Sequence, residues 1–173
     1  MSQTTTQQLN DVDLAAVGAL VGSIQADPSA AQTTWAAHVT WDRAFQSSSR
    51  VRTFSPVSSD EPAGLGGDDT AANPVEQLLG ALGNCLAVGY AANATLAGIE
   101  IDALRIDVKG DVDLHVFLGL KEGHAGFSGI SADVTLETSA PREEVDALHA
   151  KVLATSPVGH TLRTAVPVEV NLA

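Results

Sequence analysis

The hydrophobic positions in the first third of the chain change from a helical to an extended spacing. Apolar residues recur every three or four positions from Val12 to Ile24, and a proline ends that pattern. This spacing predicts an N-terminal helix within an extension of residues 1–32. The segments 34–41 and 50–54 are instead β-branched and aromatic, with a polar, serine-rich stretch between them. Together they predict a β-hairpin with a turn in the serine-rich stretch.

Residues 78–97 carry no charge and lie within the longest uncharged stretch of the chain. Asn73, Pro74 and Glu76 precede it in the order of a helix start, as N-cap, first helical residue and capping-box carboxylate. We therefore predict a helix from Asn73 to about Gly98, packed on all sides as a central helix. Twenty uncharged residues also match the length of a membrane span. The glycines and asparagines in the stretch, and the absence of a flanking Lys or Arg cluster, oppose that alternative.

Alternation dominates the C-terminal half. Along residues 101–108, Leu104, Ile106 and Val108 share one face and charged residues occupy the other, which predicts a strand. The remaining predictions, in chain order, are a continued strand at 112–118, a glycine-rich turn at 121–126, a strand at 130–137, a helix from Pro141 interrupted at Ser156-Pro157, a short helical piece, and a terminal strand at 166–172. Residues 55–73 are predicted to form a loop with at most one short strand.

Composition limits the partners of the chain. With 173 residues and 45% hydrophobic content, it can bury a substantial core, which favours one domain, residues 33–173, after the N-terminal extension. A net charge of −12, with only nine scattered Lys and Arg residues, opposes binding to nucleic acid. The chain begins without the basic and apolar regions of a secretory signal. We expect a cytoplasmic protein that does not bind nucleic acid or membranes.

Cys85 is the only cysteine, so no internal disulfide can form. A lone thiol on an apolar helix is either an inert core residue or a nucleophile controlled by its surroundings. On a helix Cys85 shares a face with Leu78, Leu82 and Val88, which is typical of a core position. Local chemistry alone leaves both possibilities open.

Other chemically active residues each have a structural alternative. Glu76 could orient a cation near the thiol, but nine residues place it about 180° from Cys85 around a straight helix, and capping explains it. Ser156 could be a nucleophile with His160 as its base, as in a hydrolase, although a serine before Pro157 is typical of an N-cap. The five histidines and the acidic residues on the strands lack metal-site spacing, so we expect no metal and no cofactor.

Two segments together resemble the signatures of the OsmC/Ohr family of thiol peroxidases. Residues 73–85 are similar to the helix pattern N-P-x-E-x-L-x-x-A-x-x-x-C, and residues 156–162 to a later C-P-V-x-x-T-L. The resemblance implies an α+β fold in which two chains form an intertwined homodimer. In that fold antiparallel sheets wrap around central helices, and here an extra N-terminal helix precedes them.

The resemblance also implies a mechanism. In the family the first cysteine attacks the peroxide, becomes a sulfenic acid, and is resolved by the second cysteine as a disulfide that a dithiol reductant opens. Cys85 matches the attacking cysteine, and Ser156 stands at the second. The supporting glutamate falls at Val75, one residue before Glu76. For the arginine that stabilises the thiolate, the best candidates are Arg50 and Arg52, with Arg43 weaker.

Two hypotheses follow. The first is a one-cysteine peroxidase, in which Cys85 reduces organic or small hydroperoxides and an external thiol resolves the sulfenic acid. The alternative is a non-catalytic OsmC-like dimer that binds a small apolar ligand or a thiol. Under either hypothesis, the resemblance predicts that the Ser156 hydroxyl lies near Cys85 and faces the thiol.

Overall fold

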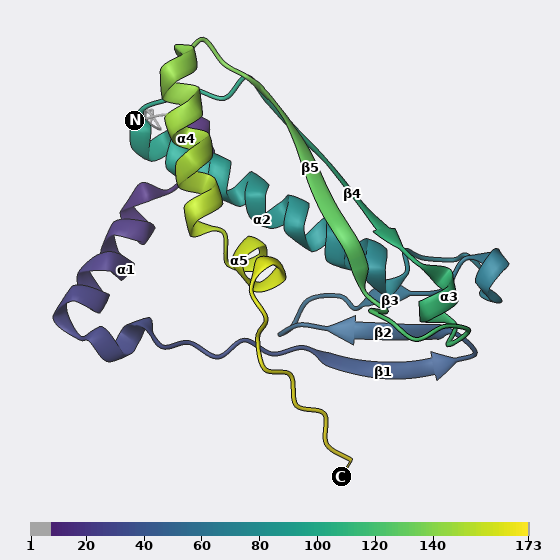
Figure 1. The fold of residues 1–173 in the computed structure, drawn as a ribbon. Helices are drawn as coiled ribbons and strands as arrows, with labels where there is room; N and C mark the ends of the chain where they lie inside the picture. Colours follow the sequence, from purple (N-terminus) through teal and green to yellow (C-terminus); the bar gives the residue numbers. More distant parts are fainter. Residues whose placement is uncertain (1–7, 173) are drawn as a thin grey trace, which may run out of the picture. The chain divides into compact units, whose positions relative to one another are not determined.

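The computed structural model describes residues 8–172 (Figure 1). The chain falls into two compact units. The first unit comprises residues 8–14 and 79–172, and the second comprises residues 15–78. The longest helix, α2 (Pro74–Ala97), begins in the second unit and continues in the first. Its bounds agree with the predicted central helix.

The second unit contains the N-terminal helix and a three-stranded antiparallel sheet. Helix α1 (Leu14–Ala26) is consistent with the predicted N-terminal helix, and a 3-10 turn capped by Asp27 follows it. The strands β1 (His38–Arg43), β2 (Gln46–Arg50) and β3 (Val57–Ser59) lie in that order. The predicted loop therefore carries one short strand.

The second strand of the predicted hairpin was placed wrongly. The serine-rich stretch expected as the turn forms β2, whereas residues 51–54 form a turn after it. The chain reverses at Ala44, which adopts a positive φ of 43°. Because β2 is the middle strand, its backbone pairs with β1 on one edge and with β3 on the other. This pairing outweighs the low intrinsic preference of serine for strands.

Asp60 organises the loop after β3. Its buried carboxylate accepts hydrogen bonds from the backbone N–H of Glu61 and from both the N–H and the hydroxyl of Thr70, and Gln46 donates a fourth. Desolvation acts to raise the pKa of Asp60, but these hydrogen bonds outweigh it and hold the pKa below its ordinary value. The loop is thus fixed by an ionised side chain.

In the first unit a two-stranded antiparallel ribbon and two helices pack on α2 (Figure 1). The ribbon pairs β4 (Ala103–Val112) with β5 (Phe127–Glu137), in register from Ala103 opposite Glu137. The alternation predicted for β4 is confirmed, because every second residue is half-buried and the others are exposed. Helix α4 (Arg142–Thr155) ends where α5 (Pro157–Arg163) begins, at the predicted interruption.

The core of this unit lies between α2, α4 and the ribbon. The buried residues of α2 fall at intervals of about four, which leaves the rest of that helix less covered within one chain. An added Cβ at Gly89 would lie 3.0 Å from Val152 Cγ1, so the glycine permits α4 to approach α2 closely. The buried hydrophobic residues are Leu82, Leu86, Tyr90, Ala94, Ile99, Leu148 and Val152.

Asn10 attaches the N-terminal segment to the end of α2. Its side-chain amide donates to Thr95 Oγ1 at 3.0 Å and to the Ile99 carbonyl at 2.9 Å, and its oxygen accepts from the Ile101 N–H. Asn10 has a φ of 53°, a conformation that asparagine tolerates better than most residues. One side chain therefore satisfies three groups where α2 leads into β4.

Two further predicted strands differ in the structure. The strand predicted at 112–118 ends at Val112, because Asp113 accepts the His115 N–H and caps a short helix, α3 (Leu114–Phe117). Residues 164–172 form no strand, although their hydrophobic residues alternate. A strand needs a neighbour for its backbone hydrogen bonds, and no strand of residues 8–172 pairs with this segment. Among the helices of residues 8–172, none has the length and apolar character needed to cross a membrane.

Candidate functional site

The start of α2 is a reciprocal capping box. The Glu76 N–H donates to Asn73 Oδ1 at 2.9 Å, and Glu76 Oε2 accepts the Asn73 N–H at 2.9 Å. This confirms the predicted helix start and gives the Glu76 carboxylate a structural role.

Cys85 and Ser156 lie together, 71 positions apart in the chain. Cys85 Sγ lies 3.3 Å from Ser156 Oγ. Ser156 is the N-cap of α5, where Oγ accepts the Gly159 N–H at 3.1 Å, and the residue is 4% exposed. Cys85 itself is half-buried. The structure therefore brings together Cys85 of the first signature segment and Ser156 of the second.

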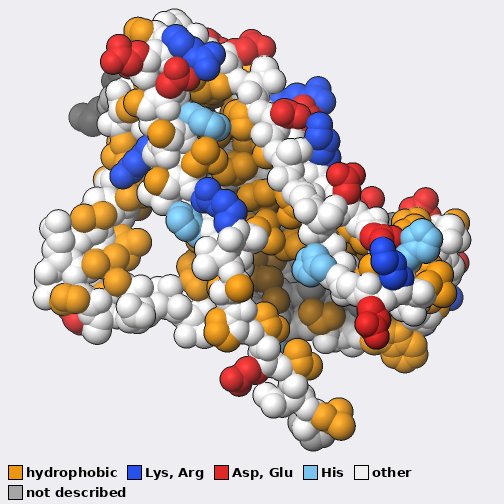
Figure 2. Space-filling view, viewed as in Figure 1, with side chains coloured by type: hydrophobic (Ala, Val, Ile, Leu, Met, Phe, Trp, Pro, Cys, Tyr) orange, Lys and Arg blue, Asp and Glu red, His pale blue; other side chains and the backbone are white. Residues whose placement is uncertain are grey.

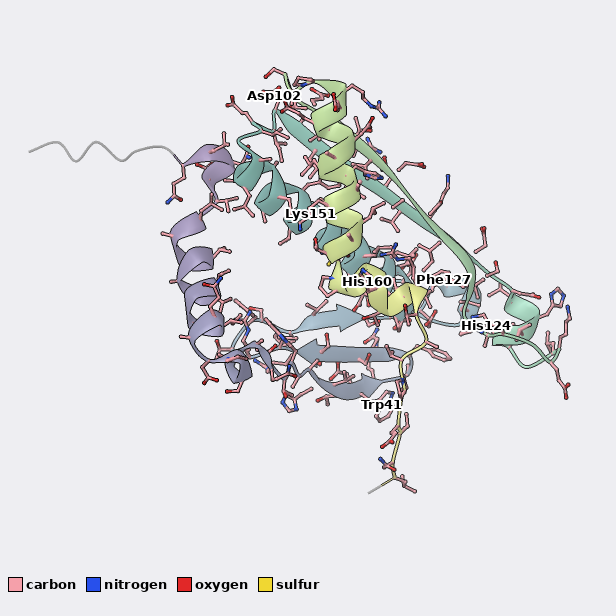
Figure 3. All side chains as sticks on the ribbon, turned by 60° about the vertical axis from the view of Figure 1, so that its left-hand side comes forward. Trp41, Asp102, His124, Phe127, Lys151 and His160 are labelled. Carbon is pink, nitrogen blue, oxygen red and sulfur yellow. The ribbon has the colours of Figure 1, made fainter. Side chains whose placement is uncertain are left out.

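A largely apolar cavity of about 380 Å³ adjoins this pair. Its walls come from α2, β5 and the α4–α5 corner, and Figure 2 shows hydrophobic side chains gathered in the hollow between α5 and β5. Figure 3 shows Phe127, at the start of β5, beside α5, the helix that carries His160. Ser156 lines the cavity, as do Leu82 and Leu86, which precede and follow Cys85 along α2. A small ligand of mainly apolar character fits such a space.

Arg163 is the one charged residue that lines this cavity, and it was not among the residues predicted from the sequence. Its guanidinium is held by the Leu153 carbonyl, at 2.8 Å from Nη2, and by the Gly159 carbonyl, at 3.1 Å from Nε. An added Cβ at Gly159 would lie 2.9 Å from Ser156 Oγ and 3.8 Å from Arg163 Nη2. The helical spacing of residues 156, 159 and 163 could have indicated their common face.

The three arginines proposed from the resemblance belong to the second unit. Arg50 ends β2, and Arg52 follows it with a positive φ of 51°. The Arg52 guanidinium carbon lies 4.6 Å from the centre of the Phe54 ring. Arg43 forms an exposed ion pair with Asp68 at 2.9 Å. A role for Arg50 or Arg52 at Cys85 stays a prediction.

The histidines form other contacts. His160 Nε2 donates to the Ala154 carbonyl at 3.1 Å, so Ser156 and His160 do not form the pair that the hydrolase alternative requires. His149 Nδ1 is hydrogen-bonded to the hydroxyl of Tyr90, a residue only 2% exposed, and burial raises the pKa of Tyr90. Within residues 8–172, no group of three His, Cys, Asp or Glu side chains is arranged to hold a metal ion.

Comparison with protein families agrees with the geometry around Cys85. The family model described as OsmC-like protein matches residues 66–171, which is more than half of the chain. The chain belongs to the OsmC-like family. The match includes Cys85, Ser156 and the cavity beside them.

Solved structures of OsmC-like proteins share this fold. An OsmC-like protein from Mycoplasma pneumoniae has a TM-score of 0.67 and 16% identity, over 77% of this chain and 89% of that one. An organic hydroperoxide resistance protein OsmC from Legionella pneumophila has a TM-score of 0.59 and 15% identity, over 76% and 92%. An organic hydroperoxide resistance protein from Elizabethkingia anophelis has a TM-score of 0.58 and 18% identity, over 78% of this chain and 92% of that one. The predicted α+β, OsmC-like fold is confirmed, whereas comparison with curated proteins found no match.

Proposed function

We propose that this OsmC-like protein is a one-cysteine thiol peroxidase that reduces organic or small hydroperoxides. The Cys85 thiolate attacks the terminal peroxide oxygen, a sulfur–oxygen bond forms, and the oxygen–oxygen bond breaks. The alkoxide takes up a proton and leaves as an alcohol, and Cys85 becomes a sulfenic acid. An external thiol then condenses with the sulfenic acid, releasing water and forming a mixed disulfide, from which a second thiol regenerates Cys85.

The observation that carries this proposal is the contact between Cys85 Sγ and Ser156 Oγ at 3.3 Å. It supports the attacking position for Cys85 because the resemblance puts the family's resolving cysteine at the position of Ser156. A serine cannot form a disulfide, so resolution falls to a thiol from outside the chain. The reducing conditions of the cytoplasm, which we propose as the location, would supply that thiol.

Arg50 and Arg52 are the proposed cations for the thiolate. Neither forms an ion pair with another described residue, which supports this choice over Arg43. Glu76 is proposed to orient one of them through the carboxylate oxygen that does not cap α2.

We further propose that the protein is an intertwined homodimer. Val88 and Leu96 of α2 are 69% and 65% exposed in one chain, and alternate hydrophobic residues of the C-terminal segment are exposed as well. A second copy would cover this apolar surface and provide a neighbour for the unpaired segment. Sedimentation at micromolar concentration is expected to show a dimer. A stable monomer at that concentration would contradict this proposal.

The peroxidase proposal is tested by trapping the oxidised cysteine. Treatment with one equivalent of an organic hydroperoxide is expected to convert Cys85 to a species that a dimedone-type probe labels. Without probe, addition of an external thiol should give a mixed disulfide at Cys85 and restore the free thiol when more is added. Mass spectrometry of the peptide containing Cys85 checks both outcomes, with protein kept from hydroperoxide as the control.

The cavity beside Ser156 supports the alternative function, binding of a small apolar ligand or a thiol without turnover. Its volume of about 380 Å³ is at the lower end of ligand-binding pockets. If excess hydroperoxide leaves Cys85 unlabelled and unchanged in mass, the peroxidase proposal fails and ligand binding takes its place.

A further inference from the structure

Ser156 occupies the position of the family's resolving cysteine, but a serine cannot form a disulfide with an oxidised Cys85. Its contact with Cys85 must therefore have a different role. We infer that the Ser156 hydroxyl donates a hydrogen bond to the Cys85 thiolate and so acts as a positioning residue that favours the ionised, nucleophilic sulfur. The catalytic role of this hydrogen bond rests on the proposed peroxidase function. The hydrogen bond itself can be tested without any peroxide.

The other contact of the hydroxyl leaves its proton available for the sulfur. The Gly159 N–H donates to Ser156 Oγ at 3.1 Å, so this contact uses an oxygen lone pair and leaves the hydroxyl proton free. Cys85 Sγ, at 3.3 Å, is the other hydrogen-bonding neighbour of Oγ among the described residues. An ionised sulfur has no proton to give, so the hydroxyl must be the donor when Cys85 is a thiolate.

Burial makes this donor important for the charge on sulfur. Ser156 is 4% exposed and Cys85 is half-buried, so water has limited access to their contact. Removing water disfavours the ionised form of a thiol, and a hydrogen bond to the ionised form favours it. The donor is also held in place, because Ser156 caps α5 and Pro157 restricts the backbone that follows.

Few charged groups on the surrounding elements compete with this effect. Helix α2 carries no charged residue between Leu78 and Ala97, and the β5 residues that line the cavity are uncharged. On α4, His149 is bonded to Tyr90, and Lys151 lines a separate hollow with Glu144. On α5, His160 and Arg163 both donate to backbone carbonyls. Arg163 is therefore the charged side chain of this unit that stands beside the Ser156 hydroxyl.

The test compares alkylation of Cys85 by iodoacetamide across the pH range in the wild-type, Ser156→Ala and Ser156→Thr proteins. Near pH 7, Ser156→Ala is expected to react about tenfold more slowly because its thiolate is less populated. At alkaline pH, where the thiol ionises in both proteins, Ser156→Ala should equal or exceed the wild type, since a thiolate freed from its donor is more nucleophilic. Ser156→Thr keeps the hydroxyl and should restore most of the rate near pH 7.

Thr155→Val is the matched control. It removes the neighbouring hydroxyl, which donates to the Lys151 carbonyl and does not contact Cys85, and it should alkylate like the wild type. If Ser156→Ala does not fold, Ser156→Gly provides the same test, because glycine is tolerated as an N-cap.

Equal rates for wild type and Ser156→Ala near pH 7 would overturn the inference. An equal slowing at every pH would also overturn it, because that result reports altered access to the sulfur. If the variants show the expected pH profile but the protein does not reduce hydroperoxides, the proposed function is wrong and the hydrogen-bond inference still holds.

Discussion

Ser156→Cys is expected to form an intramolecular disulfide with Cys85 when the protein is treated with an organic hydroperoxide. Sγ of Cys85 and Oγ of Ser156 already lie 3.3 Å apart, so a sulfur in place of Oγ needs only a small side-chain adjustment to bond. The peroxide would first oxidise Cys85, and the new thiol would then displace water from the sulfenic acid. Loss of both thiols, with a mass lower by two hydrogens, measures the reaction.

The cross-link should also stabilise the folded protein. It closes a loop between positions 71 apart, and the chain-entropy model assigns such a loop about 4 kcal/mol. Denaturant unfolding with and without a reductant checks this difference. Thr155→Cys is the matched control, because Thr155 is exposed and bonded away from Cys85, so its thiol should stay free.

The response to different oxidants separates geometry from chemistry. Cross-linking by a disulfide oxidant but not by hydroperoxide would show correct geometry without peroxide chemistry, which favours the ligand-binding alternative. Failure with both oxidants would contradict the juxtaposition of the two residues and the mechanism that depends on it.

Cys85→Ala is expected to lower hydroperoxide reduction by about a thousandfold or more. The proposed reaction passes through a covalent bond to this sulfur, and no other cysteine in the chain can replace it. Hydroperoxide consumption in the presence of an external thiol measures the loss. Cys85→Ser should be equally inactive, because a serine hydroxyl is not ionised near neutral pH.

Thr155→Val again serves as the control and should keep the wild-type rate, and circular dichroism should show that all variants are folded. Retention of the wild-type rate in Cys85→Ala would disprove the proposed mechanism. A loss that accompanies unfolding would have no bearing on catalysis, so the comparison uses the variant, Ala or Ser, that retains the wild-type spectrum.

Local sequence signals predicted the elements whose determinants lie within a few residues. The start of α2 depends on Asn73 and Glu76, which bond each other across one helical turn. The alternation along β4 and the interruption at Ser156-Pro157 are local in the same sense. These predictions were correct because the interactions that form each element are between close neighbours.

The wrong predictions concerned segments whose conformation depends on distant partners or on a competing local bond. The serine-rich strand β2 has its place because β1 and β3 pair with it on both sides. Residues 164–172 have the alternating pattern of a strand but pair with no strand in the described part of the chain. Residues 114–117 form a short helix because the Asp113 carboxylate accepts the His115 N–H. Hydrophobic pattern indicates which face is buried, but pairing decides whether a strand forms.

The sequence by itself determined that the chain has one thiol, a capped central helix and the two signatures that resemble the OsmC/Ohr family. Only the tertiary structure decided that the Ser156 hydroxyl lies 3.3 Å from that thiol, and that Arg163 lines the cavity beside it. The reason is physical: residue types and short spacings set local hydrogen bonds, whereas contacts across 71 positions depend on how α2, α4 and α5 pack around the shared core.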